Sequence, residues 1–338
     1  MSDPVVDEPP IGDPALPALL EVRDLVVTAR DRRGDLEIVH GVSLDVAPGE
    51  AVGVVGESGS GKSLTMLAVM RLLASPLVIS HGSVRFDGRD LVTLPESDMR
   101  RLRGDRLAMV YQDPMTSLNP LMRIGDQVTE AMTAHGVSHD QARVRTMELL
   151  TQVELPDPAR IARAYPHEYS GGMRQRAVIA MALAMRPRLL IADEPTTALD
   201  VTTQRQILAV VNGLRRDLAM ATIWVTHDLG VVAQLVERVI VMYAGHVVEE
   251  APVDQLFHAP QHPYTSRLLA SLPDPADDAR PPLAQIPGRP PAPHELVVGC
   301  PFRPRCAQAG DVCAERPRLE PRLGGRVACW VPPAEWRA

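Results

Sequence analysis

One loop of this chain has the residue types and spacing needed to hold phosphate. It follows the apolar run Ala51–Val55 and reads Gly56-Glu57-Ser58-Gly59-Ser60-Gly61-Lys62-Ser63. The glycines let backbone N–H groups turn toward an anion with no Cβ in the way. Lys62 supplies a positive charge and Ser63 a hydroxyl ligand for Mg²⁺, while Leu64 continues a helix whose positive dipole end faces the anion. The loop therefore predicts a nucleotide phosphate site.

Two adjacent acids end another apolar run further along the chain. The run Leu189–Ala192 leads directly into Asp193 and Glu194. At the end of a buried strand, Asp193 is suited to holding Mg²⁺. Glu194 can polarise a water molecule for in-line attack on a phosphate. An isolated acidic pair would more often be solvated loop charge, but its position downstream of a phosphate loop favours hydrolysis.

A second anion site is expected at the start of another helix. Ser170-Gly171-Gly172 precedes a helical segment, and a helix N-terminus offers unpaired N–H groups and a positive dipole end. The alternative is a plain helix with Ser170 as its N-cap. One chain cannot easily bring this segment and the phosphate loop onto one phosphate, so we expect a facing subunit to supply it.

Two more polar residues follow short apolar runs. Gln112 comes after Ala108–Tyr111, and His227 comes after Thr222–Val225. Either residue alone would be interpreted as an ordinary surface or structural side chain. Their order along the chain, with Gln112 before Ser170 and His227 after the acidic pair, is what favours a role in the same site.

Composition limits the class of protein. The 338 residues are 45% hydrophobic and only 3% aromatic, with a formal net charge of −7. Few stacking side chains and an acidic balance argue against a nucleic-acid partner. No apolar run approaches the roughly 18–20 residues needed to span a bilayer. The acidic, Pro-rich start is unlike a signal peptide, so we expect a cytosolic chain that reaches a membrane only by docking on another protein.

The apolar pattern predicts an α/β fold. Alternation over Leu20–Val27, Val42–Val46 and Ser83–Phe86 indicates a small antiparallel sheet, whereas continuous apolar runs such as Ala51–Val55 indicate parallel strands buried on both faces. Val239–Met242 leads into a final hairpin. We expect a disordered tail at 1–17, a nucleotide-binding domain at 18–250 with a helical insert at about 113–170, and an irregular, Pro-rich extension at 251–338.

The order of these motifs resembles the ATP-binding subunit of ABC transporters, a branch of the P-loop NTPases, over residues 18–250. The resemblance implies that Gly56–Ser63 is the Walker A loop, and that Asp193 and Glu194 are the Walker B aspartate and the catalytic glutamate. Ser170–Met173 matches the signature motif, with Met in place of the usual Gln. ATP and Mg²⁺ are the implied ligands, and two such domains would close head to tail over ATP.

The same resemblance assigns the remaining polar residues. Gln112 is the Q-loop residue that couples nucleotide state to the membrane partner and joins Ser63 and Asp193 around Mg²⁺. Asp200 is the D-loop residue, and His227 is the switch histidine at the γ-phosphate. Lys62, Gln112, Glu194 and His227 together form the implied catalytic group.

Three segments narrow the resemblance to dipeptide/oligopeptide importers. They are Gln112–Pro120, His262–Thr265 and Gly299–Cys306, and Met173 is typical of the D-type ATPase of those importers. The implied partners are a second, F-type ATPase, two transmembrane permease subunits and, indirectly, an extracytoplasmic solute-binding protein, at the cytoplasmic face of the membrane. Nickel or another small solute stays open as the cargo. A soluble ABC ATPase acting on DNA or ribosomes is disfavoured because basic or coiled-coil insertions are missing.

All four cysteines lie near the C-terminus: Cys300, Cys306, Cys313 and Cys329. Such clustering in a reducing compartment points to metal or iron–sulfur ligation. The loose spacing disfavours a zinc ribbon, which uses tight C-x₂-C pairs. The resemblance implies a structural [4Fe–4S] cluster, with zinc and unliganded thiols as alternatives.

One departure from the family concerns adenine. The family places an aromatic side chain shortly after the first strand, and Ala29 stands there in this chain. Loss of ring stacking, worth roughly 0.5–1.5 kcal/mol, would weaken adenine binding about tenfold. Alternatively, Arg30, Arg32 or Arg33 lies over the base.

Overall fold

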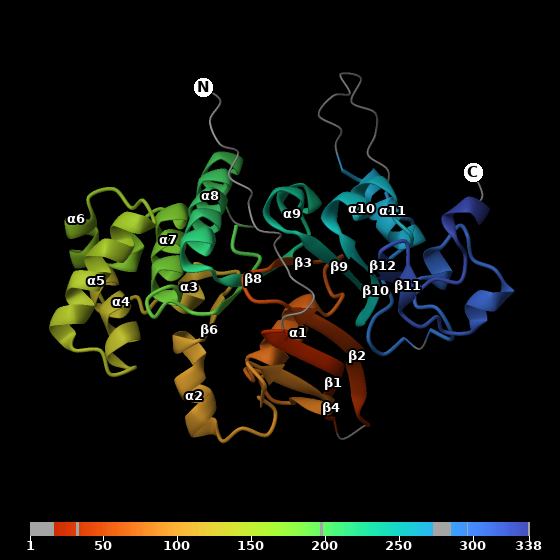
Figure 1. Ribbon diagram of the computed structural model, residues 1–338, viewed down its shortest axis with the longest axis horizontal. Coiled ribbons are helices and arrows are strands. Elements are labelled where there is room, and N and C mark those ends of the chain that lie inside the picture. The colour runs from red at the N-terminus through yellow and green to blue at the C-terminus, as the bar shows by residue number, and fades with distance from the viewer. Residues whose placement is uncertain (1–16, 32–33, 197–198, 273–284, 296, 337–338) are drawn as a thin grey trace, which may run out of the picture.

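The computed structural model describes residues 17–31, 34–196, 199–272, 285–295 and 297–336. Most of the tail expected at 1–17, together with Arg32 and Arg33, lies outside the described residues. Two sheets organise the chain, with a group of helices at one end and residues 285–295 and 297–336, called the C-terminal segment below, at the other (Figure 1). Among the described helices, none combines the length and the apolar character that a membrane crossing requires.

The larger sheet carries the continuous apolar runs. Its eight strands follow the order β11-β12-β10-β9-β3-β8-β7-β6. The five parallel strands are β3 (Ala51–Val55), β6 (Leu107–Val110), β7 (Leu189–Asp193), β8 (Ala221–Thr226) and β9 (Arg238–Tyr243). The antiparallel strands are β10 (His246–Pro252), β11 (Glu320–Arg322) and β12 (Gly325–Val327). Every residue of β3, β7 and β8 is buried, which confirms the predicted parallel core.

The smaller sheet is antiparallel, as the alternating pattern predicts. Its order is β2-β1-β4-β5, made of β1 (Leu20–Ala29), β2 (Leu36–Val46), β4 (Leu77–Phe86) and β5 (Arg89–Asp90). Its inward residues share one hydrophobic core with α1 (Lys62–Val69) and with Val52 and Val54 of β3. The small sheet therefore fixes the helix that follows the phosphate loop.

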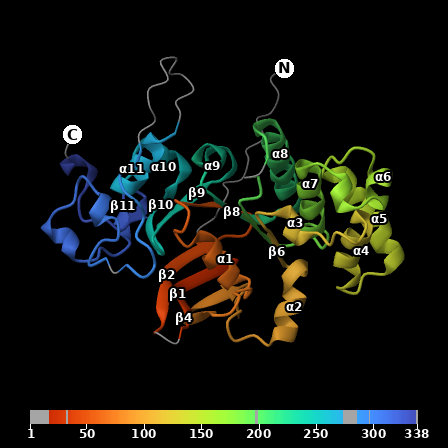
Figure 2. The same cartoon turned by 180° about the vertical axis from the view of Figure 1, so that it is seen from behind.

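Helices cover the rest of the core. The expected helical insert contains α3 (Pro114–Ser117), α4 (Ile124–Thr133), α5 (His139–Gln152) and α6 (Pro158–Arg163), which gather with α7 (Gly171–Ala182) at one end of the molecule in both views (Figures 1 and 2). The other α-helices are α2 (Glu96–Asp105), α8 (Val201–Leu218), α9 (Leu229–Leu235), α10 (Val253–His258) and α11 (Pro263–Ala270). Short 3₁₀ turns occupy Pro166–Glu168, Arg303–Arg305, Asp311–Ala314 and Pro333–Glu335.

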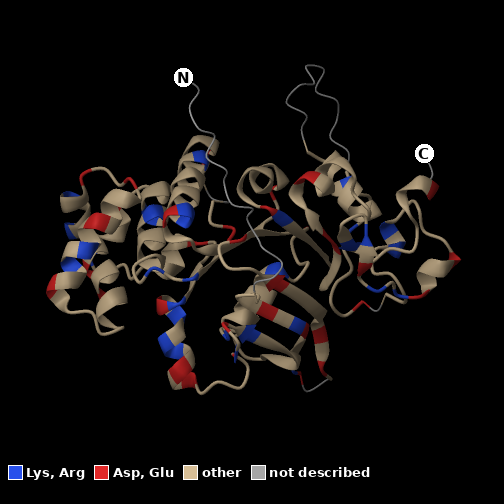
Figure 3. Cartoon of the chain, viewed as in Figure 1, with Lys and Arg blue, Asp and Glu red and all other residues tan. Residues whose placement is uncertain are grey.

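Charged residues of both signs are interspersed over the view in Figure 3, and basic residues recur along α2.

The C-terminal segment adds two short strands to the large sheet. Strand β12 pairs with β10, with Glu249 opposite Val327, so residues after 320 continue the large sheet. Nearer the centre, the ring of Phe302 lies 5.3 Å from the rings of both Tyr243 and Tyr264. The sequence does not predict this sheet continuation, because three-residue strands leave no clear alternating pattern.

The aromatic contact generates a stability prediction. Phe302 is 1% exposed, so Phe302→Ala should lower the free energy of unfolding by about 3–5 kcal/mol through lost burial and a cavity. Urea denaturation followed by circular dichroism measures the change. Val298→Ala, at a side chain 76% exposed, is the control and should change it by less than about 0.5 kcal/mol. A loss below about 1 kcal/mol for Phe302→Ala would contradict the packing.

Candidate nucleotide site

The phosphate loop joins β3 to α1 and has a backbone that requires glycine. At Gly56 φ is 149°, and a Cβ there would lie 2.1 Å from the carbonyl oxygen of Met242. The Lys62 ammonium is buried beneath the loop, 2.7 Å from the carbonyl oxygen of Gly56 and 3.0 Å from that of Glu57. Burial lowers the pKa of Lys62, opposed by the nearby carboxylates of Glu194 and Asp193. The Lys62 ammonium therefore donates hydrogen bonds to the backbone of its own loop.

The structure brings the loop and the acidic strand end together. The Ser63 hydroxyl donates a hydrogen bond of 2.8 Å to Oδ1 of Asp193, which ends β7. Burial raises the pKa of Asp193 above its usual value, and this hydrogen bond only partly opposes the shift. A hydroxyl and a carboxylate side by side are the hard oxygen donors that Mg²⁺ prefers. Of the donor set predicted from the sequence, Ser63 and Asp193 are therefore adjacent in space and suited in kind to that ion, whereas the Gln112 side chain hydrogen-bonds Glu194.

Glu194 lies at the meeting point of three strand ends. Its carboxylate accepts a hydrogen bond from Nε2 of Gln112 at 3.3 Å and lies 3.2 Å from Nδ1 of His227. Gln112 follows β6 and His227 follows β8, on either side of β7. A φ of 46° at Glu194 turns the chain sharply there, and its N–H donates to the carbonyl oxygen of Val225. An acid, an amide and an imidazole thus converge beside the loop.

The Ser170–Met173 segment begins α7 at a different place. Ser170 caps the helix by accepting a hydrogen bond from the Met173 N–H at 3.3 Å. Among the described residues, no hydrogen bond or ion pair joins Ser170–Gly172 to the phosphate loop. The segment instead adjoins the start of α8, where a Cβ on Gly172 would lie 2.5 Å from Cγ2 of Thr203.

Asp200 serves as the N-cap of α8. Its carboxylate accepts hydrogen bonds from the Thr203 N–H at 3.0 Å and from the Thr203 hydroxyl at 2.7 Å. These bonds lower the pKa of Asp200. Ala198, two residues before Asp200 in the sequence, lies outside the described residues.

A cavity of about 500 Å³ adjoins the phosphate loop near the position expected to hold adenine. Ala29 ends β1 and pairs with Leu36, and Leu36 lines this cavity together with Ile38 and Gly59 of the loop. The lining also includes Pro291, Ala292 and Pro293 from the C-terminal segment. The sequence does not predict this part of the lining, because nothing in a Pro-rich stretch identifies what it will contact.

The four cysteines converge. All of them line one small cavity of about 10 Å³. Burial raises the pKa of Cys300 and of Cys329 to about 11. Thiols suit iron or zinc in kind. Even so, within the described ranges no set of three or more His, Cys, Asp or Glu side chains is placed to hold a metal ion.

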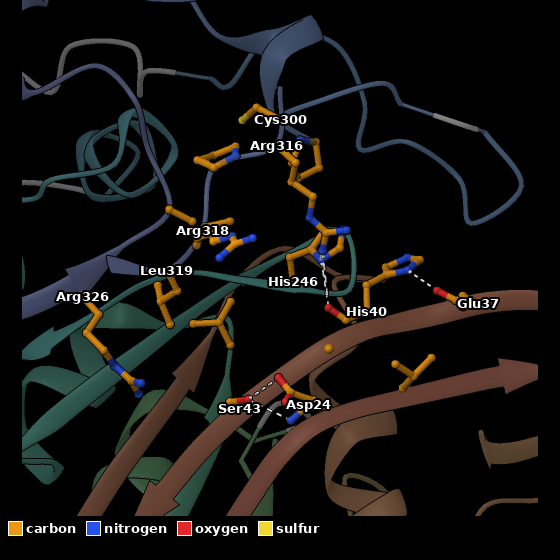
Figure 4. A pocket seen from close by; sticks show the side chains of 17 residues that line it. Asp24, Glu37, His40, Ser43, His246, Cys300, Arg316, Arg318, Leu319 and Arg326 are labelled. Atoms are coloured by element: carbon orange, nitrogen blue, oxygen red, sulfur yellow. Dashed lines mark hydrogen bonds and ion pairs between the residues drawn. The ribbon is translucent and has the colours of Figure 1, made fainter. Parts of the chain in front are cut away.

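A cavity of about 720 Å³ contains no residue of the phosphate loop, but it shares His40, His246 and Arg316 with the 500 Å³ cavity beside that loop. Figure 4 shows it between the small sheet and the C-terminal segment, where His246 and Arg316 lie close together beside His40. The two imidazole rings stack with their centroids 4.5 Å apart. Burial, with the positive Arg316 nearby, lowers the pKa of His246 to about 3. This face is a contact between two parts of the chain, next to the cavity that adjoins the phosphate loop.

Comparisons with known proteins agree with this geometry. A family described as "ABC transporter" matches residues 39–197, and one described as "Oligopeptide/dipeptide transporter, C-terminal region" matches residues 248–313. The oligopeptide transport ATP-binding protein OppD of Salmonella typhimurium is 47% identical over 319 residues, which cover 94% of this chain and 95% of the relative. A probable peptide ABC transporter ATP-binding protein of Sinorhizobium fredii is 49% identical, covering 94% and 96%.

A solved structure also matches. It is the dimeric, post-hydrolysis state of the ATP-binding cassette MJ0796 bound to ADP and Pi, with a TM-score of 0.63 and 29% sequence identity. The match covers 69% of this chain and 98% of the cassette. Together with the curated relatives, this confirms the family that the motifs indicate. The chain belongs to the ABC transporter ATP-binding proteins, in the branch that carries the oligopeptide/dipeptide transporter C-terminal region.

Proposed function

We propose that this chain binds and hydrolyses ATP to power a membrane importer of di- or oligopeptides. The observation that carries the proposal is the convergence of Gln112, Glu194 and His227 beside the Ser63–Asp193 pair and Lys62. The peptide substrate rests on the names of the relatives and on the C-terminal region that they share. A nickel or other small-solute importer would use the same ATPase chemistry.

Each residue has a defined part in this function. Lys62 and the loop N–H groups bind the ATP phosphates, and Ser63, Gln112 and Asp193 would hold Mg²⁺, which offsets phosphate charge when bound. Glu194 accepts a proton from the attacking water. His227, 3.2 Å from Glu194, lies where it can contact the γ-phosphate and orient that carboxylate. The cavity beside Gly59 takes the adenine, with Leu36 and Ile38 on one side.

The remaining half of each site comes from a second subunit. Ser170–Gly172 lies at the start of a twelve-residue helix, away from this chain's own loop, and suits the phosphates of a facing subunit. The dimeric state of the MJ0796 cassette supports such a pairing. Met173 in place of Gln favours a heterodimer with an F-type homologue. Two permease subunits would bind this pair at the cytoplasmic face of the membrane, with a solute-binding protein on the other side.

The role of Glu194 is tested by removing its basicity. Glu194→Gln should lower ATP turnover by about 10²–10⁴-fold while ATP binding persists, because only proton transfer is lost. The variant should accumulate as an ATP-bound dimer, which size-exclusion chromatography with light scattering measures. Glu130→Gln, at an exposed position on α4, is the matched control and should keep full turnover. Undiminished hydrolysis by Glu194→Gln would exclude the proposed role.

Contact between the signature segment and α8 gives a second test. Gly172→Ala places a Cβ 2.5 Å from Cγ2 of Thr203 and should lower the free energy of unfolding by about 1–3 kcal/mol. Adding Thr203→Ser removes Cγ2, keeps the hydroxyl that bonds Asp200, and should restore most of the loss. Gly171→Ala is the control, since the nearest atom to its Cβ would be Cδ2 of Leu199 at 3.4 Å, an ordinary contact. Urea denaturation measures the free energy of unfolding of each variant. The contact would be refuted if Gly172→Ala lost the same free energy of unfolding with and without Thr203→Ser.

We also propose that the four cysteines hold a [4Fe–4S] cluster with a structural role. Their convergence on one cavity and their thiol chemistry support it. Closer approach of the sulfur atoms would be needed, because the described residues show no arrangement ready for a metal ion.

Metal analysis of anaerobically purified full-length chain tests this proposal. About four iron and four acid-labile sulfide atoms per chain are expected, and Cys313→Ser should lower both. Val312→Ala, an exposed neighbour, is the control and should retain them. One zinc without sulfide, or a metal-free chain with four freely titrating thiols, would overturn the cluster.

A further inference from the structure

The phosphate loop carries an acid that ought to oppose its function. Glu57 is the second residue of the loop, and its side chain is 27% exposed. A carboxylate in a site for phosphate repels its ligand, and at the partly buried surface of a protein such repulsion is several times stronger than in water. ATP binding at this loop is therefore favoured when the charge on Glu57 is offset.

Arg305 of the C-terminal segment binds that carboxylate through both terminal nitrogens of its guanidinium. One terminal nitrogen lies 2.6 Å from Oε2 of Glu57 and the other lies 3.0 Å from Oε1. This bidentate geometry is the strong and directional form of an ion pair. The partners are 248 residues apart in the sequence, so only the fold brings them together.

The guanidinium is held in place by the segment that carries it. The Arg305 side chain is 5% exposed, and its Nε donates 2.8 Å to the carbonyl oxygen of Pro287. Further hydrogen bonds run to the carbonyl oxygen of Ile286 and to the Tyr243 hydroxyl. A buried arginine fixed from three sides offsets charge at one defined position, unlike a mobile surface side chain.

The backbone of Glu57 is fixed as well. Its N–H donates a hydrogen bond of 2.8 Å to the hydroxyl oxygen of Tyr264. Tyr264 is fully buried against Tyr243 and Phe302, and burial raises its pKa, so the hydroxyl stays neutral. The Glu57 N–H is thereby occupied, and phosphate binding falls to the N–H groups nearer α1.

We propose that Arg305 is a positioning residue for ATP, which neutralises Glu57 and sets the shape of the phosphate loop from the C-terminal segment. The proposal rests on the proposed function in one respect, that the loop binds ATP. The competing interpretation is a purely structural ion pair, called a staple below, that only holds the C-terminal segment against the nucleotide-binding domain. A staple affects stability alone, whereas a positioning charge affects the affinity for ATP and its dependence on salt.

The first variant removes the positive charge. Arg305→Gln in the full-length chain should weaken MgATP binding roughly tenfold, because it leaves the Glu57 carboxylate without its ion-pair partner near the phosphates. Arg305→Lys keeps the charge and should stay within about threefold of the original affinity. Isothermal titration with MgATP at two salt concentrations measures both, and the Arg305→Gln deficit should shrink at high salt.

The second variant removes the acid too. Glu57→Gln combined with Arg305→Gln should recover most of the lost affinity, which a structural staple would not do, because the staple stays broken in the double variant. If Arg305→Gln alone does not fold, the test uses the double variant. A folded double variant that binds MgATP tenfold more weakly than the original chain refutes the proposal.

The matched control is Arg101→Gln, which breaks an exposed ion pair with Asp98 on α2, outside the phosphate loop and the cavity beside it. It should leave MgATP binding unchanged. Equal MgATP affinity in Arg305→Gln and the original chain, or a deficit that the second substitution fails to relieve, overturns the inference while leaving the proposed function intact. Failure of the original chain to bind MgATP would instead overturn the proposed function itself.

Discussion

Parallel pairing of β6, β7, β8 and β3 is the constraint on which the site depends. Parallel strands end at the same edge of a sheet, so residues that follow separate strands become neighbours without any sequence proximity. Gln112, Glu194 and His227 meet for this reason, and the loop after β3 lies at the same edge. The Ser63–Asp193 hydrogen bond then joins the loop to the acidic strand end. The chemistry is therefore a property of strand order as much as of residue type.

Much of this arrangement could be predicted from local patterns. Continuous apolar runs identify buried parallel strands, and polar residues placed after those runs identify the sheet edge at which their side chains meet. Alternation in Leu20–Val27 likewise identifies the small sheet. These predictions succeed because burial on one or two faces leaves a direct mark on the residue order of each strand.

The contacts of the C-terminal segment could not be predicted in this way. Arg305 precedes Cys306 in a stretch without helical or strand periodicity, and nothing in its neighbourhood indicates a partner 248 residues earlier. No pattern in the sequence predicts the proline-lined wall beside Gly59 either. Long-range ion pairs and pocket walls depend on tertiary packing, which a single sequence does not display.

The β10–β12 pairing has a consequence for solubility. Without residues 320–327, the outer side of β10 would present unpaired N–H and C=O groups along an open sheet margin, which invites association with other chains. The margin that replaces it is β11, only three residues long, with a proline at its centre and a charged residue on each side. Short, charged and proline-containing margins resist such association. The last part of the chain thus protects the ATPase core from self-assembly through its own backbone.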